Sequence, residues 1–231
     1  WGPELLGYAL EINLSTTLGV KDERDAALRE LYRDFRFRRA LSHAIDREGI
    51  AQSIMRGPFL RGWAGGLYPG APDFEKESVV YYAYDLPSAQ ALLAELGFED
   101  TDGNGIVNWT SGPLEGEDLT IAITATEDQA EAATTGEALV TMLGQAGIKV
   151  NYRPVTSTAR REIETSGEWE MHVSRMGQNF ALPFTSCNDL GPTNPQSPVW
   201  HREGEEPREL LDFEHELIEV INAYCATTDP V

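Results

Sequence analysis

The segment 119–152 constrains the fold most, because its hydrophobic period changes twice. In LTIAIT at 119–124 apolar residues alternate with polar or small ones, which is typical of a strand. Residues 128–145 then carry small or apolar residues at helical spacing, namely Ala132, Gly136, Leu139, Val140 and Leu143. Alternation returns at 148–152. Such a strand, helix and strand predict a βαβ unit with parallel strands and a right-handed crossover.

The rest of the chain extends this α/β pattern. Residues 158–167 favour a short helix that ends at a glycine, and WEMHVSRM at 169–176 alternates as a strand. LLGYALEINL at 5–14 predicts a further strand. A helix is expected to begin at Pro207, since the apolar residues after it keep helical spacing: Leu210, Leu211, Leu217, Ile218, Ile221 and Tyr224.

Residues 33–57 predict two consecutive helices that form a scaffold. Apolar residues at helical spacing make one face of the first helix, with Asp34 able to cap it. His43 falls on the opposite, polar face, and Asp46 stands where a second short helix can begin. Nothing in this segment has the arrangement of a catalytic site.

The run FRFRRALSHAIDREGI at 35–50 resembles a signature of bacterial extracellular solute-binding proteins of the peptide, oligopeptide and nickel class. Nine residues match the family pattern: Phe37, Arg38, Ala40, Leu41, Ala44, Ile45, Asp46, Arg47 and Glu48. A second block, YDLPSAQALLAELGFEDTDGNG at 84–105, resembles the next segment of the family. The resemblance implies a type II periplasmic-binding-protein-like lobe, in which helices flank a mixed β-sheet.

The resemblance also implies that residues 1–231 form a single, incomplete carboxy-terminal lobe of a two-lobed protein. Family members are more than twice as long, and the expected first lobe and carboxy-terminal return have no counterpart here. Residues 227–230 have the composition of a helix start, from which we expect truncation.

Composition excludes some partners and leaves the redox state open. The formal charge of −20 repels phosphate backbones and argues against nucleic-acid binding. No run approaches the roughly 20 apolar residues of a membrane helix. Cys187 and Cys225 are the two cysteines, and two cysteines alone do not establish whether they pair.

The loop DTDGNGIVN at 100–108 has two interpretations. Asp100, Asp102 and Asn104 occupy the first, third and fifth positions of an EF-hand-type loop, so they are candidate calcium ligands. However, Ser111 stands at the twelfth position, where a bidentate glutamate is needed, and a strand follows instead of a helix. The same residue types also favour tight turns, so a solvated hairpin is the alternative.

The segment SRMGQNFALPF at 174–184 is the main candidate for solute binding. It follows a predicted strand at the carboxyl end, where open α/β sheets place ligands. In the family that the chain resembles, this position lines the cleft, and an aspartate there anchors the amino group of a peptide. In this chain no acid stands between Gly177 and Pro183. The predicted cleft residues here are Arg175, Met176, Gln178, Asn179 and Phe180. An ordinary exit from a strand into a loop is the alternative.

A second candidate is the stretch RGWAGGLYPGAP at 61–72, where the paired glycines and Trp63 suit a loop that stacks on a ligand. A surface loop held by one buried tryptophan is the alternative.

The sequence favours a binding module without chemistry of its own. Its four histidines are scattered, and it has neither a nucleophile elbow nor a phosphate-binding loop. The resemblance implies a monomeric, periplasmic or lipid-anchored extracellular component of an ABC importer. That protein would deliver a peptide-like or other small polar solute to an inner-membrane permease. The alternative function is a calcium-stabilised structural or adhesive module.

Overall fold

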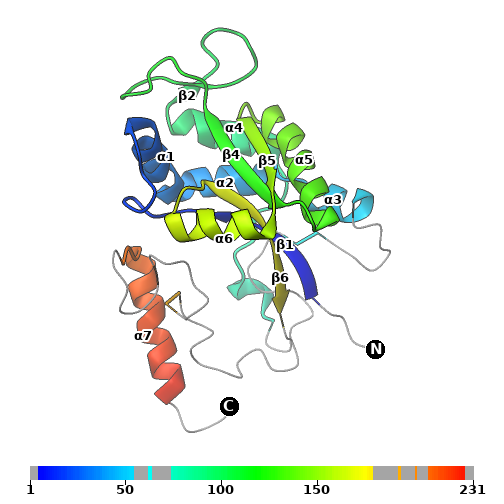
Figure 1. The fold of residues 1–231 in the computed structure, drawn as a ribbon, viewed down its shortest axis with the longest axis vertical. Coiled ribbons are helices and arrows are strands. Elements are labelled where there is room, and N and C mark those ends of the chain that lie inside the picture. Colours follow the sequence, from blue (N-terminus) through cyan, green and yellow to red (C-terminus); the bar gives the residue numbers. More distant parts are fainter. Residues whose placement is uncertain are drawn as a thin grey trace.

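The computed structural model describes residues 5–54, 62–63, 74–178, 192–193, 201 and 208–226. A four-stranded sheet in the order β1-β6-β4-β5 forms its centre (Figure 1). The strands of this sheet are β1 (Leu5–Ile12), β4 (Thr120–Thr126), β5 (Lys149–Val155) and β6 (Met171–Gln178). A two-stranded hairpin pairs β2 (Phe98–Glu99) with β3 (Asn108–Trp109). The helices are α1 (Glu23–Arg33), α2 (Phe35–Ala44), α3 (Arg47–Ser53), η1 (Lys76–Ser78), α4 (Leu86–Glu95), α5 (Ala130–Gln145), α6 (Ser157–Ser166) and α7 (Asp212–Ala226).

The sheet is mixed, as the resemblance implied. Strand β4 pairs in parallel with both β5 and β6, whereas β1 pairs with β6 antiparallel. The predicted βαβ unit is therefore confirmed, with α5 as its crossover helix. The predicted strand at 5–14 is confirmed over Leu5–Ile12.

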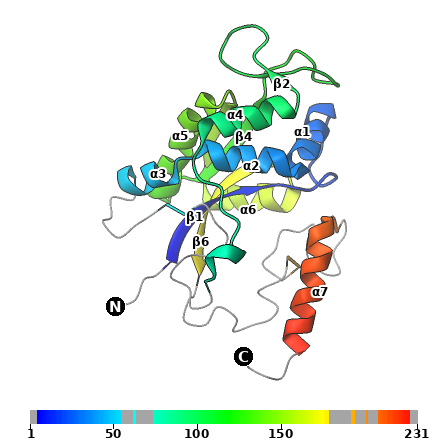
Figure 2. The ribbon, with the colours of Figure 1, turned by 180° about the vertical axis from the view of Figure 1, so that it is seen from behind.

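The two faces of the sheet differ in chemistry. One face packs its aliphatic side chains against α2, α4 and α5 in a single core, and α6 lies over the other face (Figures 1 and 2). On β6, Met171 and Val173 enter the core at 0% and 1% exposure. His172 and Ser174 point to the α6 face and are also buried, at 1% and 5%. Residues 171–174 of β6 are thus buried on both faces, with apolar residues on one and polar residues on the other.

A polar network occupies the α6 face. The Thr124 hydroxyl lies 2.7 Å from His172 Nδ1, and Arg160 of α6 donates to Ser174 Oγ at 3.1 Å. Arg160 also lies 3.6 Å from the Glu11 carboxylate of β1. None of the α6 residues is fully buried, so polar contacts contribute to holding this helix on the sheet.

The predicted pair of helices at 33–57 corresponds to α2 and α3. Asp34 caps α2 by accepting from Arg36 N, and Asp46 caps α3 by accepting from Gly49 N. The prediction for His43 was wrong, because this residue is only 9% exposed. Residues 83–85 pack against the end of α2. His43 Nδ1 lies 2.7 Å from the Ala83 carbonyl, and Asp85 N donates to His43 O at 2.9 Å.

Two further predictions are wrong, and one helix was not predicted. Helix α1 was not expected, although Asp22 caps it and Leu28, Leu31 and Tyr32 form its buried face. Val140 was placed on the buried face of α5 but is 36% exposed. The helix expected from Pro207 begins at Asp212, and residues 208–211 are not helical.

The carboxy-terminal segment 208–226 lies at the edge of the molecule (Figure 1). Exposed apolar residues follow one side of α7, namely Phe213, Leu217 and Val220. Cys225, near the end of α7, is disulfide-bonded. Cys187, the other cysteine in the chain, lies outside the described residues.

Candidate functional site

The carboxyl ends of the parallel strands meet at one edge of the sheet, which we call the carboxyl edge. The pairing of β4 with β6 ends at Ala125 and Val173. Residues 174–178 therefore extend past this point, paired with residues 5–9 of β1. Open α/β sheets bind ligands at such an edge.

A tyrosine and two charged side chains influence one another electrostatically at the carboxyl edge. Arg175 pairs with Tyr8 in the β1-β6 register and is exposed. Burial raises the pKa of the Tyr8 hydroxyl, and the Glu131 carboxylate in the first turn of α5 raises it further. The Arg175 guanidinium opposes both effects. Tyr8, Glu131 and Arg175 thus share one electrostatic environment at this edge.

The structure accounts for part of the predicted cleft. Arg175, Met176 and Gln178 lie on β6 at the carboxyl edge. Asn179 and Phe180 lie outside the described residues. Sequence reasoning missed Tyr8 and Glu131, because only the strand register and the start of α5 bring them to this edge.

An aromatic segment, residues 62–63 and 74–84, lies near the same edge in projection. Figures 1 and 2, which view the molecule from opposite sides, both draw η1 close to the end of β6. Within this segment the ring centroids of Trp63 and Tyr81 lie 4.9 Å apart, and those of Trp63 and Phe74 lie 6.0 Å apart. Tyr81 and Tyr84 remain 51% and 46% exposed. Exposed rings held by other aromatic residues can stack on a ligand.

The aromatic segment is anchored on α2 and α3. Arg39 lies over the Tyr82 ring at 5.4 Å, and the His43 ring meets Tyr82 edge-on at 5.6 Å. At Gly62 an added Cβ would lie 2.4 Å from the backbone of Arg47, so Trp63 is held close to the start of α3. The aromatic run VVYYAY at 79–84 is the sequence signal for this surface, and the sequence-based predictions do not include it.

The loop at 100–105 directs its oxygens to its own backbone. Asp100 accepts from the amides of Gly103, Asn104 and Gly105 at 2.8, 3.2 and 3.0 Å. Asp102 accepts from Asn104 N at 3.1 Å. Among the described residues, no cluster of three or more His, Cys, Asp or Glu side chains is placed to hold a metal ion. Calcium binding at Asp100, Asp102 and Asn104 stays a prediction.

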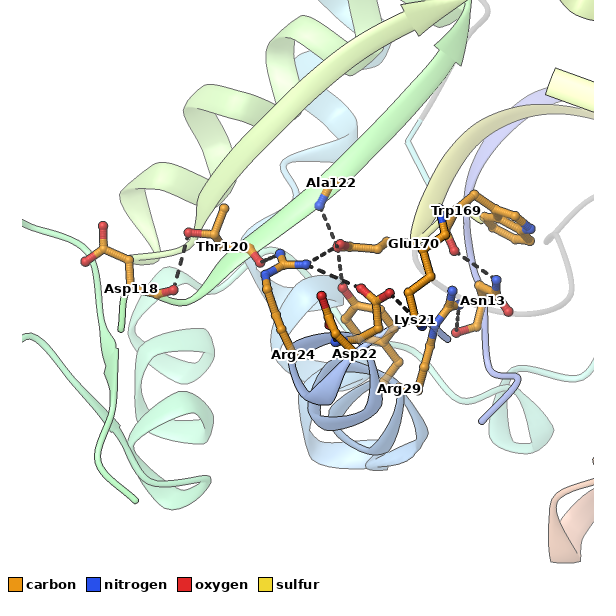
Figure 3. Close-up of polar contacts among 12 residues, drawn as sticks. Asn13, Lys21, Asp22, Arg24, Arg29, Asp118, Thr120, Ala122, Trp169 and Glu170 are labelled. Atoms are coloured by element: carbon orange, nitrogen blue, oxygen red, sulfur yellow. Dashed lines mark hydrogen bonds and ion pairs between the residues drawn. The ribbon is translucent and has the colours of Figure 1, made fainter. Parts of the chain in front are cut away.

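A polar hollow of about 410 Å³ lies away from the carboxyl edge, between the start of α1, strands β4 and β5, and the turn before β6. Figure 3 shows the polar contacts around it. Lys21 contacts Glu168 at 2.6 Å, and Arg24 contacts Glu170 at 3.1 Å. The second Glu170 oxygen accepts from Tyr32 Oη and Ala122 N, both at 2.7 Å. These charges pair with one another and connect α1 to β4.

Comparison with known proteins identifies the family. The model of the bacterial extracellular solute-binding proteins, family 5 (middle region), matches residues 1–197. The chain belongs to this family. Family 5 relatives include the periplasmic alpha-galactoside-binding protein of Rhizobium meliloti (strain 1021), which is 32% identical over 99% of this chain and 33% of its own length. The chain thus spans about one third of that relative.

Solved structures support the fold of this family 5 chain. The periplasmic binding protein MelB from Agrobacterium fabrum C58, in complex with stachyose, superposes with a TM-score of 0.86 at 32% identity. The match covers 99% of this chain and 34% of MelB. An oligopeptide-binding protein, OppA, superposes with a TM-score of 0.75 at 23% identity over 98% of this chain and 38% of its own, which supports the fold alone.

The expected fold, a type II periplasmic-binding-protein-like lobe with a mixed sheet, is therefore confirmed. The relatives are named as solute-binding proteins. No helix in the described ranges is both long and apolar enough to cross a lipid bilayer.

Proposed function

We propose that this chain is one lobe of a two-lobed component of a bacterial ABC importer that captures an oligosaccharide of the α-galactoside type. The observation that carries the proposal is the 32% identity to an alpha-galactoside-binding protein across 99% of the chain. The stachyose complex of MelB, which matches the chain to the same extent, supports the same class of solute.

The chain's own residues favour a sugar over a peptide. A peptide amino group needs a carboxylate partner, but the segment 174–184 contains no acid. Gln178 and Asn179 are neutral amides, which can donate to and accept from sugar hydroxyls. The exposed Tyr81 ring, supported by Trp63, offers a flat apolar surface for the C–H face of a pyranose.

The proposed mechanism is hinge closure. The solute contacts both lobes and so stabilises the closed state, which a permease in the inner membrane then recognises. This role is carried out in the periplasm, or outside the cell by a lipid-anchored protein, and needs no catalytic chemistry.

Titration calorimetry on the complete protein tests this function. Stachyose, maltotetraose and tetraalanine serve as the three probes, at one pH and ionic strength. We expect micromolar or tighter binding of stachyose, weaker binding of maltotetraose and no heat from the peptide. Binding of tetraalanine without binding of stachyose would overturn the sugar assignment.

A further inference from the structure

The turn that follows β1 surrounds a carboxylate with hydrogen-bond donors. The carboxylate belongs to Glu209, just before α7. The donors belong to residues 15–17, which we call the Ser15–Thr17 turn. One Glu209 oxygen accepts from Ser15 Oγ at 2.6 Å, from Thr17 Oγ1 at 2.6 Å and from Thr17 N at 3.2 Å. The other accepts from Thr16 N and from Thr16 Oγ1, the latter at 2.6 Å. Three consecutive residues thus provide five donors to a single carboxylate.

Contacts that do not involve Glu209 hold this turn in shape. Asn13 is fully buried and donates from Nδ2 to the Gly167 and Trp169 carbonyls at 3.0 and 2.8 Å (Figure 3 shows its contact with Trp169). Its Oδ1 accepts from Ser15 N at 3.2 Å. An added Cβ at Gly19 would lie 2.2 Å from the Gly167 backbone, so the two turns are in close contact. The donors are therefore positioned by the lobe itself.

Positive charge lies behind the turn. Arg29 donates to the Asn13 carbonyl at 3.2 Å, and Arg33 donates to the Leu14 carbonyl at 2.9 Å. Burial alone would raise the pKa of Glu209, but the hydrogen bonds from Ser15, Thr16 and Thr17 outweigh it and lower this pKa to about 2. The Ser15–Thr17 turn thus binds an ionised carboxylate. Charge-assisted hydrogen bonds of this kind are stronger than neutral ones.

We propose that the Ser15–Thr17 turn is an oxyanion-binding site for carboxylates and tetrahedral oxyanions, and that Glu209 is its ligand within the same chain. Glu209 fastens residues 208–211, and with them the start of α7, to the end of β1. Because β1 is antiparallel to β6, this site lies at the opposite end of the sheet from the carboxyl edge. It is independent of the solute site and of the proposed solute.

Chemical rescue tests the proposal. Glu209→Ala leaves the site open, and we expect a melting temperature several degrees below that of the wild-type chain. Adding sodium acetate or sodium sulfate, with sodium chloride holding the ionic strength constant, should raise the melting temperature of E209A along a saturating curve. Because sulfate stabilises most proteins through general exclusion, the quantity to compare is the rise in excess of that for the wild-type chain.

Two controls make the rescue specific. Glu216→Ala removes an exposed carboxylate from α7 and should respond to anions like the wild-type chain. Adding Thr16→Val and Thr17→Val to E209A should abolish the saturable part of the rescue. If E209A does not fold, E209Q replaces it. Sulfate should displace the neutral amide of E209Q from the Ser15–Thr17 turn, whereas it should not displace the carboxylate of the wild-type chain. Equal anion responses in E209A or E209Q, E216A and the wild-type chain would overturn the proposal.

Discussion

His172 is a buried histidine whose ring stays neutral at physiological pH. Burial first, and then the positive charge of Arg160, lower the pKa of His172 from 6.5 to about 4. The unfolded chain therefore binds a proton between pH 6.5 and 4 that the folded chain does not. Stability attributable to this residue is full above the unfolded pKa and decreases as the pH falls towards 4.

Replacing His172 with Gln should remove this pH dependence. One pKa unit corresponds to about 1.4 kcal/mol, and allowing for solvent screening we expect His172 to account for about 2 kcal/mol of acid destabilisation by pH 4.5. Urea unfolding at pH 7 and pH 4.5 should show a smaller loss for H172Q than for the wild-type chain. His215→Gln, on the exposed side of α7, is the matched control. Equal losses for all three proteins would contradict the prediction.

Tyr81 is the residue through which the aromatic segment can be tested. Its ring is 51% exposed and supported by Trp63, so Tyr81→Ala should remove a stacking surface and little else. If the ring stacks on the sugar, the affinity of the complete protein for stachyose should fall about tenfold, which corresponds to roughly 1.4 kcal/mol. Phe35→Ala removes a similarly exposed ring, at the start of α2, and should leave the affinity unchanged. An unchanged affinity in Y81A would exclude the ring from the site.

At the scale of elements, α5 approaches β5 closely at one glycine. An added Cβ at Gly136 would lie 2.3 Å from the Tyr152 ring, whose hydroxyl donates to the Ala133 carbonyl at 3.0 Å. Gly144, on the same helix, has no atom within 4 Å of an added Cβ apart from its chain neighbours and its own helix backbone. The two glycines therefore provide a matched pair of helix substitutions.

Gly136→Ala should destabilise the protein by about 1–3 kcal/mol, because the ring and the helix must move apart. Gly144→Ala should instead stabilise it by about 0.5–1 kcal/mol through helix propensity. Denaturant titration of both variants measures the difference. Two substitutions that stabilise equally would show that the approach of α5 to β5 is not tight.

Most elements were predictable where local pattern and tertiary packing agree. The βαβ unit from 119 to 155 was predicted because hydrophobic period alone distinguishes its strands from its helix. The start of α7 was not, since a proline at a first-turn position favours a helix from 207. Glu209 is bound by the Ser15–Thr17 turn, and residues 208–211 are not helical. The Glu214 carboxylate accepts from Leu211 N at 2.7 Å at the observed start of the helix.

The candidate site was predictable only in part, because its members come from distant segments. The position of Arg175 to Gln178 at a strand end follows from sequence pattern. The pairing of Tyr8 with Arg175 depends on strand register, and the placement of Tyr81 beside Trp63 depends on how residues 79–85 fold back over α2. The aromatic run at 79–84 is visible in the sequence, but neither pairing can be read from it.

At the scale of the whole molecule, the segment that carries α7 is attached near both of its ends. Glu209 binds the Ser15–Thr17 turn, and Cys225 is in a disulfide. Reduction should lower the free energy of unfolding by about 4 kcal/mol on the chain-entropy estimate. Chemical unfolding with and without dithiothreitol measures this loss. The double variant C187S/C225S should be insensitive to the reductant, and a wild-type chain equally insensitive would contradict the prediction.

Residues 171–174 of β6 are buried on both faces of the sheet, and this also restricts how the chain can misfold. A shift of this strand by one residue against its neighbours would turn His172 and Ser174 into the aliphatic core and place Met171 and Val173 among the Thr124, Glu11 and Arg160 side chains. Both exchanges are unfavourable, because polar groups would lose their hydrogen bonds and apolar groups their packing. An ordinary amphipathic strand is penalised for such a slip mainly on one face. In β6 a shifted register is penalised on both faces, so the native pairing of β6 with β1 and β4 is favoured more strongly during folding.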